Sequence, residues 1–244
     1  MRHVVRLLSF LIAVSASTPA LATVAFGTPV TTGGTFAPGS STLTASLTVS
    51  TGSTIVVGVL SAGITSTLSV ADNVNGAYTQ LDVLNDASFT SSGGTFAKTN
   101  SASGSVTITV TFGTAANFPV LSAVEITGAA TGAIDGHAGA VQSAGSGSAL
   151  SSGNFTSTAQ PALLIGWAIN DTGDAPTVGG SGFTIVTTAP ATGSWEWKRV
   201  TATGTQAATY TSSDFGGHMT FGLAVDESSG AGPTFNAMFY GGSP

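Results

Sequence analysis

The segment that most constrains the fold is a short apolar run at residues 162–169. Seven of the eleven residues in 160–170, QPALLIGWAIN, are apolar. Pro161 precedes the run and the turn-forming residues 170–173 follow it. A run this short and this apolar is typical of a strand with both faces buried. We therefore expect a central strand here, covered by the other strands of the chain.

The remaining apolar residues mostly alternate with Thr and Ser, as in residues 43–49 and 106–112. This alternation is typical of half-buried strands. Turn signals recur every eight to fifteen residues, no segment sustains a helical period, and no tandem repeat of fixed period is evident. The pattern predicts an all-β chain folded as an antiparallel two-sheet β-sandwich.

Two hairpins are expected within this pattern. Residues 43–49 lead through a Thr-Gly-Ser turn into 55–60, IVVGVL, a second nearly continuous apolar run, and the two segments resemble a hairpin. Further along, Asn75-Gly76 is a strong hairpin signal because both residues tolerate positive φ.

Composition bears on the surface. The chain is 42% hydrophobic, which is enough for a sizeable core, but only 7% charged, against about 25% in ordinary soluble domains. Ser, Thr, Gly and Ala fill the difference, and Ser, Thr and Gly disfavour helix. We therefore expect a hydroxyl-rich, nearly uncharged surface.

Residues 1–22 have the features of a secretory signal peptide. Arg2 and Arg6 are followed by an apolar stretch at 7–16 and by Ala20-Leu21-Ala22, an A-x-A cleavage site. The alternative is a membrane anchor, but about 10 apolar residues are fewer than the roughly 20 that span a bilayer. The expected organisation is a signal peptide (1–22), a β-sandwich domain (23–227), and a C-terminal strand or tail (228–244). We expect secretion to the extracellular space, cell surface or periplasm.

The charge of the mature chain limits its partners. Without residues 1–22, three cations (Lys98, Lys198 and Arg199) stand against eleven Asp and Glu, a net charge of −8. Such a chain has no basic patch to neutralise phosphates, so nucleic-acid binding and anionic membrane surfaces are disfavoured. No later segment is long enough to span a membrane, and the absence of Cys is compatible with export.

The order of several short motifs resembles a family of secreted bacterial and phage-associated β-sandwich domains of unassigned function. The resemblance covers residues 43–226 and implies a jelly-roll-like pair of antiparallel sheets. It transfers no catalytic residues to this chain. Val74, between Asn73 and Asn75, departs from the shorter Asp-Asn-x-Gly-Asn turn of the family, which weakens a ligand site there. The matching segments are VADNVNGAY at 70–78, AVEITG at 123–128, IDG at 134–136, PALLIG at 161–166, GF at 182–183, WE at 195–196 and FGLAV at 221–225.

Trp195 and Trp197 are candidate ligand-binding residues. Two positions apart on a strand, they project from one face about 7 Å from each other. Facing solvent, with Tyr78 as a third ring, they would stack on sugars. Facing inward, they are core, and leaving the intervening Glu196 and Lys198 in water favours this interpretation.

Glu196 is also a candidate, with two further interpretations. It or Glu125, another lone acid in an apolar strand, could pair with Lys198 or Arg199. Alternatively, the two glutamates could be the acid and nucleophile of a glycosidase, a chemistry that requires a set carboxyl separation.

Calcium is the only cofactor for which the sequence offers candidates. These are Asp72, Asn73 and Asn75 in one turn, and Asp171 and Asp174 in another. Both groups are more simply turn residues that bond their own backbone. His137 and His218 lie in loop-like contexts, and without Cys they make a transition-metal site improbable. No nucleophile-elbow, phosphate-loop or dinucleotide motif occurs.

These observations lead to one principal hypothesis and three alternatives. The principal hypothesis is an exported, non-catalytic β-sandwich that acts as a structural or adhesive surface module toward carbohydrate or cell-surface components. The alternatives are a carbohydrate-binding module, an exported hydrolase on a jelly-roll scaffold, and self-assembly through unpaired strand edges.

Overall fold

The computed structural model describes residues 23–33, 40–159, 161–170, 176–188, 193–212 and 214–228. All of them belong to one compact unit, Ala22–Ser228. The expected signal peptide, residues 229–244 and the calcium candidates Asp171 and Asp174 lie outside the described residues. Among the described residues, no helix is long and apolar enough to cross a membrane.

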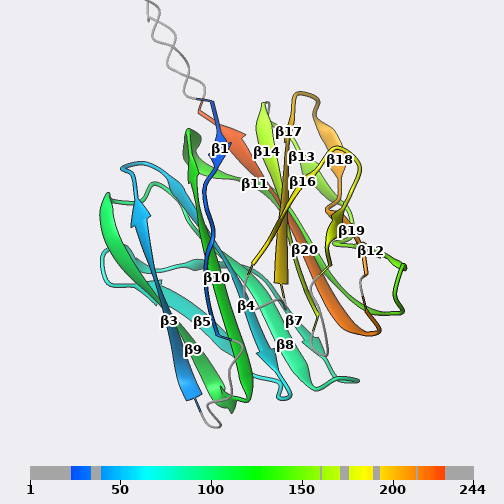
Figure 1. The fold of residues 1–244 in the computed structure, drawn as a ribbon. Helices are drawn as coiled ribbons and strands as arrows, with labels where there is room; N and C mark the ends of the chain where they lie inside the picture. Colours follow the sequence, from blue (N-terminus) through cyan, green and yellow to red (C-terminus); the bar gives the residue numbers. More distant parts are fainter. Residues whose placement is uncertain are drawn as a thin grey trace, which may run out of the picture. The chain divides into compact units, whose positions relative to one another are not determined.

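The described chain forms antiparallel sheets that lie in successive layers (Figure 1). The first outer sheet has the order β3 (Ser40–Val49), β9 (Gly104–Ala116), β5 (Leu68–Asp72), β6 (Gly76–Ala77). The first inner sheet has the order β1 (Ala25–Phe26), β10 (Phe118–Thr127), β4 (Thr54–Ala62), β8 (Ser91–Lys98), β7 (Thr79–Asp86), and β2 (Val30–Gly33) also pairs with β10.

The second half of the chain adds a second inner sheet and a second outer layer. The second inner sheet has the order β11 (Ala129–Ala144), β20 (Gly216–Glu227), β14 (Ala162–Asn170), β17 (Gly193–Val200), β16 (Thr184–Thr187). The second outer layer consists of β12 (Ala149–Ser151), β19 (Thr209–Thr211) and β15 (Val178–Gly179), with β13 (Phe155–Ser157) and β18 (Gly204–Gln206) as a separate pair.

Two main cores separate these layers. Alternating residues of β4 and β10 divide between them, because successive side chains of a strand point to opposite faces. The core between the first outer and first inner sheets includes Leu47, Ile55, Val57, Val59, Phe96, Val106, Ile108, Val110 and Leu121. The core between the two inner sheets includes Val56, Leu60, Val124, Leu163, Ile165, Trp167, Ile169, Trp195, Phe221 and Val225.

The two halves of the chain repeat one strand order. The first half contains β1 to β10 and the second half β11 to β20. In each inner sheet, the last strand of the half lies between the first strand and the fully buried strand: β1-β10-β4 and β11-β20-β14. The outer layers correspond as well, as β3-β9-β5 and β12-β19-β15. The described chain therefore consists of two sandwiches that pack through their inner sheets.

The antiparallel all-β sandwich expected from the sequence is confirmed. The buried strand at 162–169 is confirmed too, since all nine residues of β14 are buried. The chain builds more sheets than the two expected, because β4 and β14 each have a layer on both faces. The finer expectation of a jelly-roll-like order stays a prediction.

One expected hairpin is wrong and the other is confirmed. β3 pairs with β9, whereas β4 pairs with β10 and β8 in a different sheet. The half-buried β3 belongs to an outer sheet and the fully buried β4 to an inner one, so the turn between them crosses from layer to layer. Asn75-Gly76 does close a hairpin, in which Asp72 faces Gly76.

Tryptophans of the second inner sheet fill the space between the inner sheets. Trp167 and Trp195 are fully buried, and their ring centroids lie 4.6 Å apart. The first inner sheet offers glycines to this sheet: a Cβ at Gly58 would lie 2.5 Å from the Trp167 indole, and one at Gly93 would lie 2.7 Å from Ile169 Cδ1 and Met219 Sδ. The indole of Trp195 donates to Ser122 Oγ across the interface at 2.8 Å.

Gly58 should therefore tolerate no side chain. We expect Gly58→Ala to destabilise the protein by ~1–3 kcal/mol, as overpacking of a core typically does, because the rigid Trp167 ring cannot move aside. The free energy of unfolding, from urea titration followed by tryptophan fluorescence, measures the effect. Gly145→Ala is the matched control, since its Cβ would lie 3.9 Å from its nearest neighbour. Equal stability of the two variants would contradict this packing.

Candidate functional site

The aromatic candidates do not form an exposed platform. Trp195 is fully buried, and Trp197 is half-buried and stacked on Phe26, with ring centroids 6.1 Å apart and an interplanar angle of 14°. Tyr78 is 8% exposed, and its hydroxyl donates to Asp72 at 2.8 Å. The side of β17 that carries both tryptophans thus belongs to the core between the inner sheets, as its pattern of charges favoured.

The expectation that Glu196 faces water is wrong. Its side chain is fully buried, because the second outer layer covers this face of β17. One carboxylate oxygen accepts the amide of Gly180, just after β15, and the other accepts the amide of Thr209 in β19, both at 2.9 Å. Glu196 therefore fastens two short outer strands to the second inner sheet.

Burial makes this carboxyl a weaker acid than an exposed glutamate. Desolvation raises the pKa of Glu196 to about 7, against the lowering effect of the two amides and of Lys198. A glycine makes room for the group, since a Cβ at Gly166 would lie 2.7 Å from both Glu196 Cγ and the Tyr210 hydroxyl oxygen. The side chain has no exposed surface, and both its oxygens are engaged by backbone amides, which suits a structural role.

Glu196 should make stability depend on pH. Because its pKa is higher in the folded state than in the unfolded state, it stabilises the fold below about pH 4.5, and this contribution is lost as pH rises through about 7. Glu196→Gln should lack this loss, so its stability relative to wild type should improve by about 2–3 kcal/mol between pH 4.5 and 8.

Urea unfolding of wild type and Glu196→Gln across this pH range measures the difference. Groups that titrate in both proteins cancel in the comparison. Glu125→Gln serves as the matched control at a half-exposed glutamate. Parallel pH profiles for wild type and Glu196→Gln would refute the account of this carboxyl.

The two glutamates cannot act as a glycosidase pair. Glu125 lies on the face of β10 that meets the first outer sheet, and it accepts the amide of Ser50 at 2.5 Å. Glu196 lies on the far face of the second inner sheet, so both inner sheets separate the two carboxyls. Neither forms a salt bridge with the proposed cations: Arg199 pairs with Glu227 at 2.8 Å, and Lys198 lies 4.2 Å from the Phe183 ring centroid.

The first calcium candidate is a hydrogen-bonded turn. Asp72 accepts the amides of Val74 and Asn75, the side chain of Asn75 and the hydroxyl of Tyr78. Burial alone would raise the pKa of Asp72, but these hydrogen bonds outweigh it and lower the pKa. The side-chain oxygens of Asn73 and Asn75 accept hydrogen bonds from the backbone amides of Thr107 and Ala102, respectively. The side-chain oxygens of this turn thus organise the backbone around it.

Both histidines lie on strands, contrary to the loop-like contexts expected. His137 on β11 contacts Asp82 on β7 at 2.9 Å. His218 on β20 is fully buried, with Nε2 3.0 Å from Ser212 Oγ and Nδ1 3.1 Å from the Gly216 carbonyl. Burial lowers the pKa of His218, but Ser212 is also buried, so this Ser-His pair is closed to a substrate.

One pair of carboxyls does lie close together. Asp135 sits in the irregular pairing between β11 and β20, next to Asp226. Burial, then the charge of Asp135, raises the pKa of Asp226 to about 6. Asp135 itself is held by Thr158 and Ala159. Among the described residues no group of three or more His, Cys, Asp or Glu could hold a metal ion.

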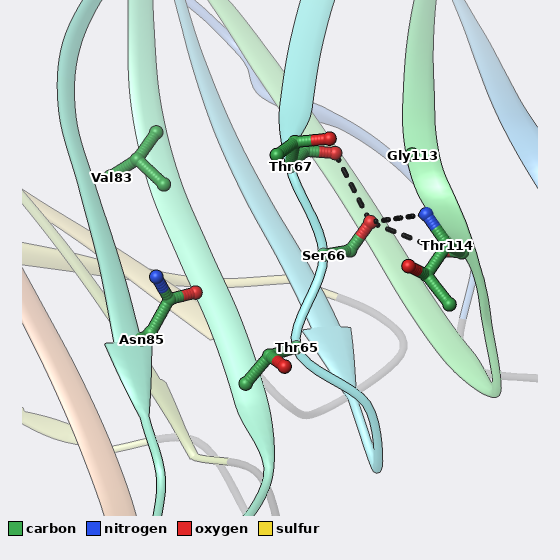
Figure 2. Close-up of a pocket in the computed structure, with 7 residues that line it drawn as sticks. All are labelled: Thr65, Ser66, Thr67, Val83, Asn85, Gly113 and Thr114. Carbon is green, nitrogen blue, oxygen red and sulfur yellow. Dashed lines mark hydrogen bonds between the residues drawn. The ribbon is translucent and has the colours of Figure 1, made fainter.

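A recess lies at the rim between the first outer and first inner sheets. Figure 2 shows its lining from three segments: the connection from β4 to β5, β7, and β9. Its volume is about 360 Å³, within the usual range for ligand pockets. The lining residues are Thr65, Ser66, Thr67, Val83, Asn85, Gly113 and Thr114. None of these seven residues is ionisable.

Internal hydrogen bonds hold the recess in shape. The buried Ser66 hydroxyl accepts the amide of Thr114 at 3.0 Å and lies 3.1 Å from the carbonyls of Thr67 and Thr114. The Ser66 amide donates to Ser92 Oγ at 2.8 Å, and Ser92 donates to Asn85 Oδ1 at 2.5 Å. Sequence reasoning missed this site, because its three segments are far apart in the chain and carry no motif.

The outer face of the first outer sheet is a second neutral surface. Its inward side chains fill the core, and those that point outward carry hydroxyls in register across the strands. Thr44 pairs with Thr109, Ser46 with Thr107, and Thr48 with Ser105 between β3 and β9, while Ser69 of β5 pairs with Thr111. Along β3, β5 and β9, Asp72 is the only ionisable residue, and it is buried.

Comparison of the chain with models of protein families finds no match, and comparison with curated proteins finds none either. Of the resemblance drawn from the sequence, the β-rich fold is what the structure supports.

Proposed function

We propose that the protein is an exported, non-catalytic surface module that adheres to neutral, hydroxyl-rich polymers. The observation that carries this proposal is the outer face of the first outer sheet, where Thr and Ser side chains lie in register on three strands without an outward charge. The leader-like residues 1–22 support export, and the proposed role needs no cofactor.

Such a face suits a neutral partner for physical reasons. Hydroxyls lose less free energy than charged groups when water is displaced from them, and threonine methyls contribute apolar area. Strands about 4.8 Å apart, with outward residues about 6.7 Å apart along each strand, make a regular array. Many weak contacts of this kind add up on a polymer surface, because each further contact is effectively intramolecular.

The hydrolase alternative is not supported by the described residues. It requires ionisable groups that converge on a pocket, whereas Glu196 and His218 are enclosed and the recess has a neutral lining. The carbohydrate-binding alternative cannot rest on Trp195, which is buried. It requires a different location.

Sedimentation with insoluble cellulose and chitin tests the proposal. The mature protein should be retained, and 1 M NaCl should leave retention unchanged, because salt screens only charge interactions. Thr44→Lys and Thr111→Lys, each a single exposed change on the face, should reduce the bound fraction at least about tenfold, since each costs ~1.4 kcal/mol or more. Thr203→Lys, in an exposed connection outside the face, is the matched control.

Retention that survives both face substitutions would contradict the proposal, as would retention lost in salt. Light scattering on the same samples separates adhesion from self-association through strand edges. A concentration-dependent mass that Thr44→Lys abolishes would show that the face serves contacts between copies of the chain.

A further inference from the structure

The geometry points to a saccharide site that the sequence did not reveal: the recess between the β4–β5 connection, β7 and β9 binds one neutral sugar unit. This inference is independent of the adhesive face, since the recess lies at the rim between two sheets and draws Val83 and Asn85 from the first inner sheet. With such a site the protein would bind single sugar units or the ends of sugar chains.

The recess offers uncommitted hydrogen-bonding groups around one space. Within the described chain, the side-chain hydroxyls of the exposed Thr65 and Thr114 make no hydrogen bond to protein, and neither does Asn85 Nδ2. Asn85 Oδ1 is occupied by Ser92, which fixes the amide and leaves its N–H groups as donors. Figure 2 shows Asn85 and Thr65 on opposite sides of the recess.

The chemistry of this lining selects the ligand class. Two hydroxyls that donate and accept, together with one amide donor, match the vicinal hydroxyls of a sugar. With no ionisable lining residue, nothing compensates the desolvation of an anion or cation. The half-buried Val83 offers an apolar patch to the C–H side of a sugar ring, but no aromatic ring lines the recess, so binding should be weak and selective for hydroxyl geometry.

Contacts within the first outer sheet fix the backbone beside the recess. The Gly113 amide donates to the Thr67 carbonyl at 2.9 Å. On the outward face of the sheet the Thr67 side chain lies over Gly113, since a Cβ there would lie 2.0 Å from Thr67 Oγ1. Together with the Ser66 network, these contacts hold the backbone of Thr65 and Thr114 in place before a ligand arrives, which reduces the entropy lost on binding.

Two-dimensional amide NMR of the full mature chain tests the inference, with glucose, galactose, N-acetylglucosamine and cellobiose as probes. At least one should shift the resonances of Thr67, Gly113 and Thr114 in a saturable way. Thr114→Val removes one hydroxyl at constant shape, and Asn85→Asp replaces the amide donor with a charged acceptor. Each should weaken binding at least tenfold.

Thr205→Val, an exposed threonine on β18, should leave the affinity unchanged. Dispersed spectra will show that each variant is folded. The mapping of chemical-shift changes in the wild type does not depend on the variants. The inference is overturned if no probe shifts these resonances at high millimolar concentration, or if the shifts map elsewhere. It is also overturned if glycerol shifts the recess as strongly, or if glucuronate binds more tightly than glucose. Retention on cellulose by Thr114→Val would leave the adhesive face standing alone.

Discussion

The contact between the two inner sheets holds the described fold together. Trp167 projects from the second inner sheet toward Gly58 of the first, and Ile169 and Met219 project toward Gly93, so large side chains on one sheet meet glycines on the other. Because the inner sheets pack through this contact, β4 and β14 are buried on both faces. The outer layers are thereby left as the surfaces at which a partner can be met.

The burial that follows from this packing explains which parts of the fold could be predicted from the sequence. Periodicity reports how much of a strand is buried, so the apolar run of β14 and the alternation of β9 were interpreted correctly. It does not report which sheet a strand joins, and the expected β3–β4 hairpin was therefore wrong. The repeated strand order escaped notice because corresponding strands differ where the halves meet: β8 places Gly93 at the interface and β17 places Trp195 there.

The candidate sites were harder to predict, for two physical reasons. The burial of Glu196 depends on β15 and β19, which are short strands distant in the sequence, so an isolated strand pattern leaves the charge in water. The recess depends on backbone brought together from 65–67, 83–85 and 113–114, and its ordinary threonines become distinctive only when their hydroxyls share one space. The hydroxyl-rich, uncharged surface followed from composition alone, and both proposed binding surfaces have that character.

A double-mutant cycle between Gly58 and Trp167 tests the central claim most directly. The account predicts that the free-energy cost of Gly58→Ala falls by at least about 1 kcal/mol when Trp167 is replaced by Leu, because residues in contact are energetically coupled. Such coupling would show that the two inner sheets pack in solution through this pair. Additive costs, within about 0.3 kcal/mol, would contradict it and with it the arrangement of the layers.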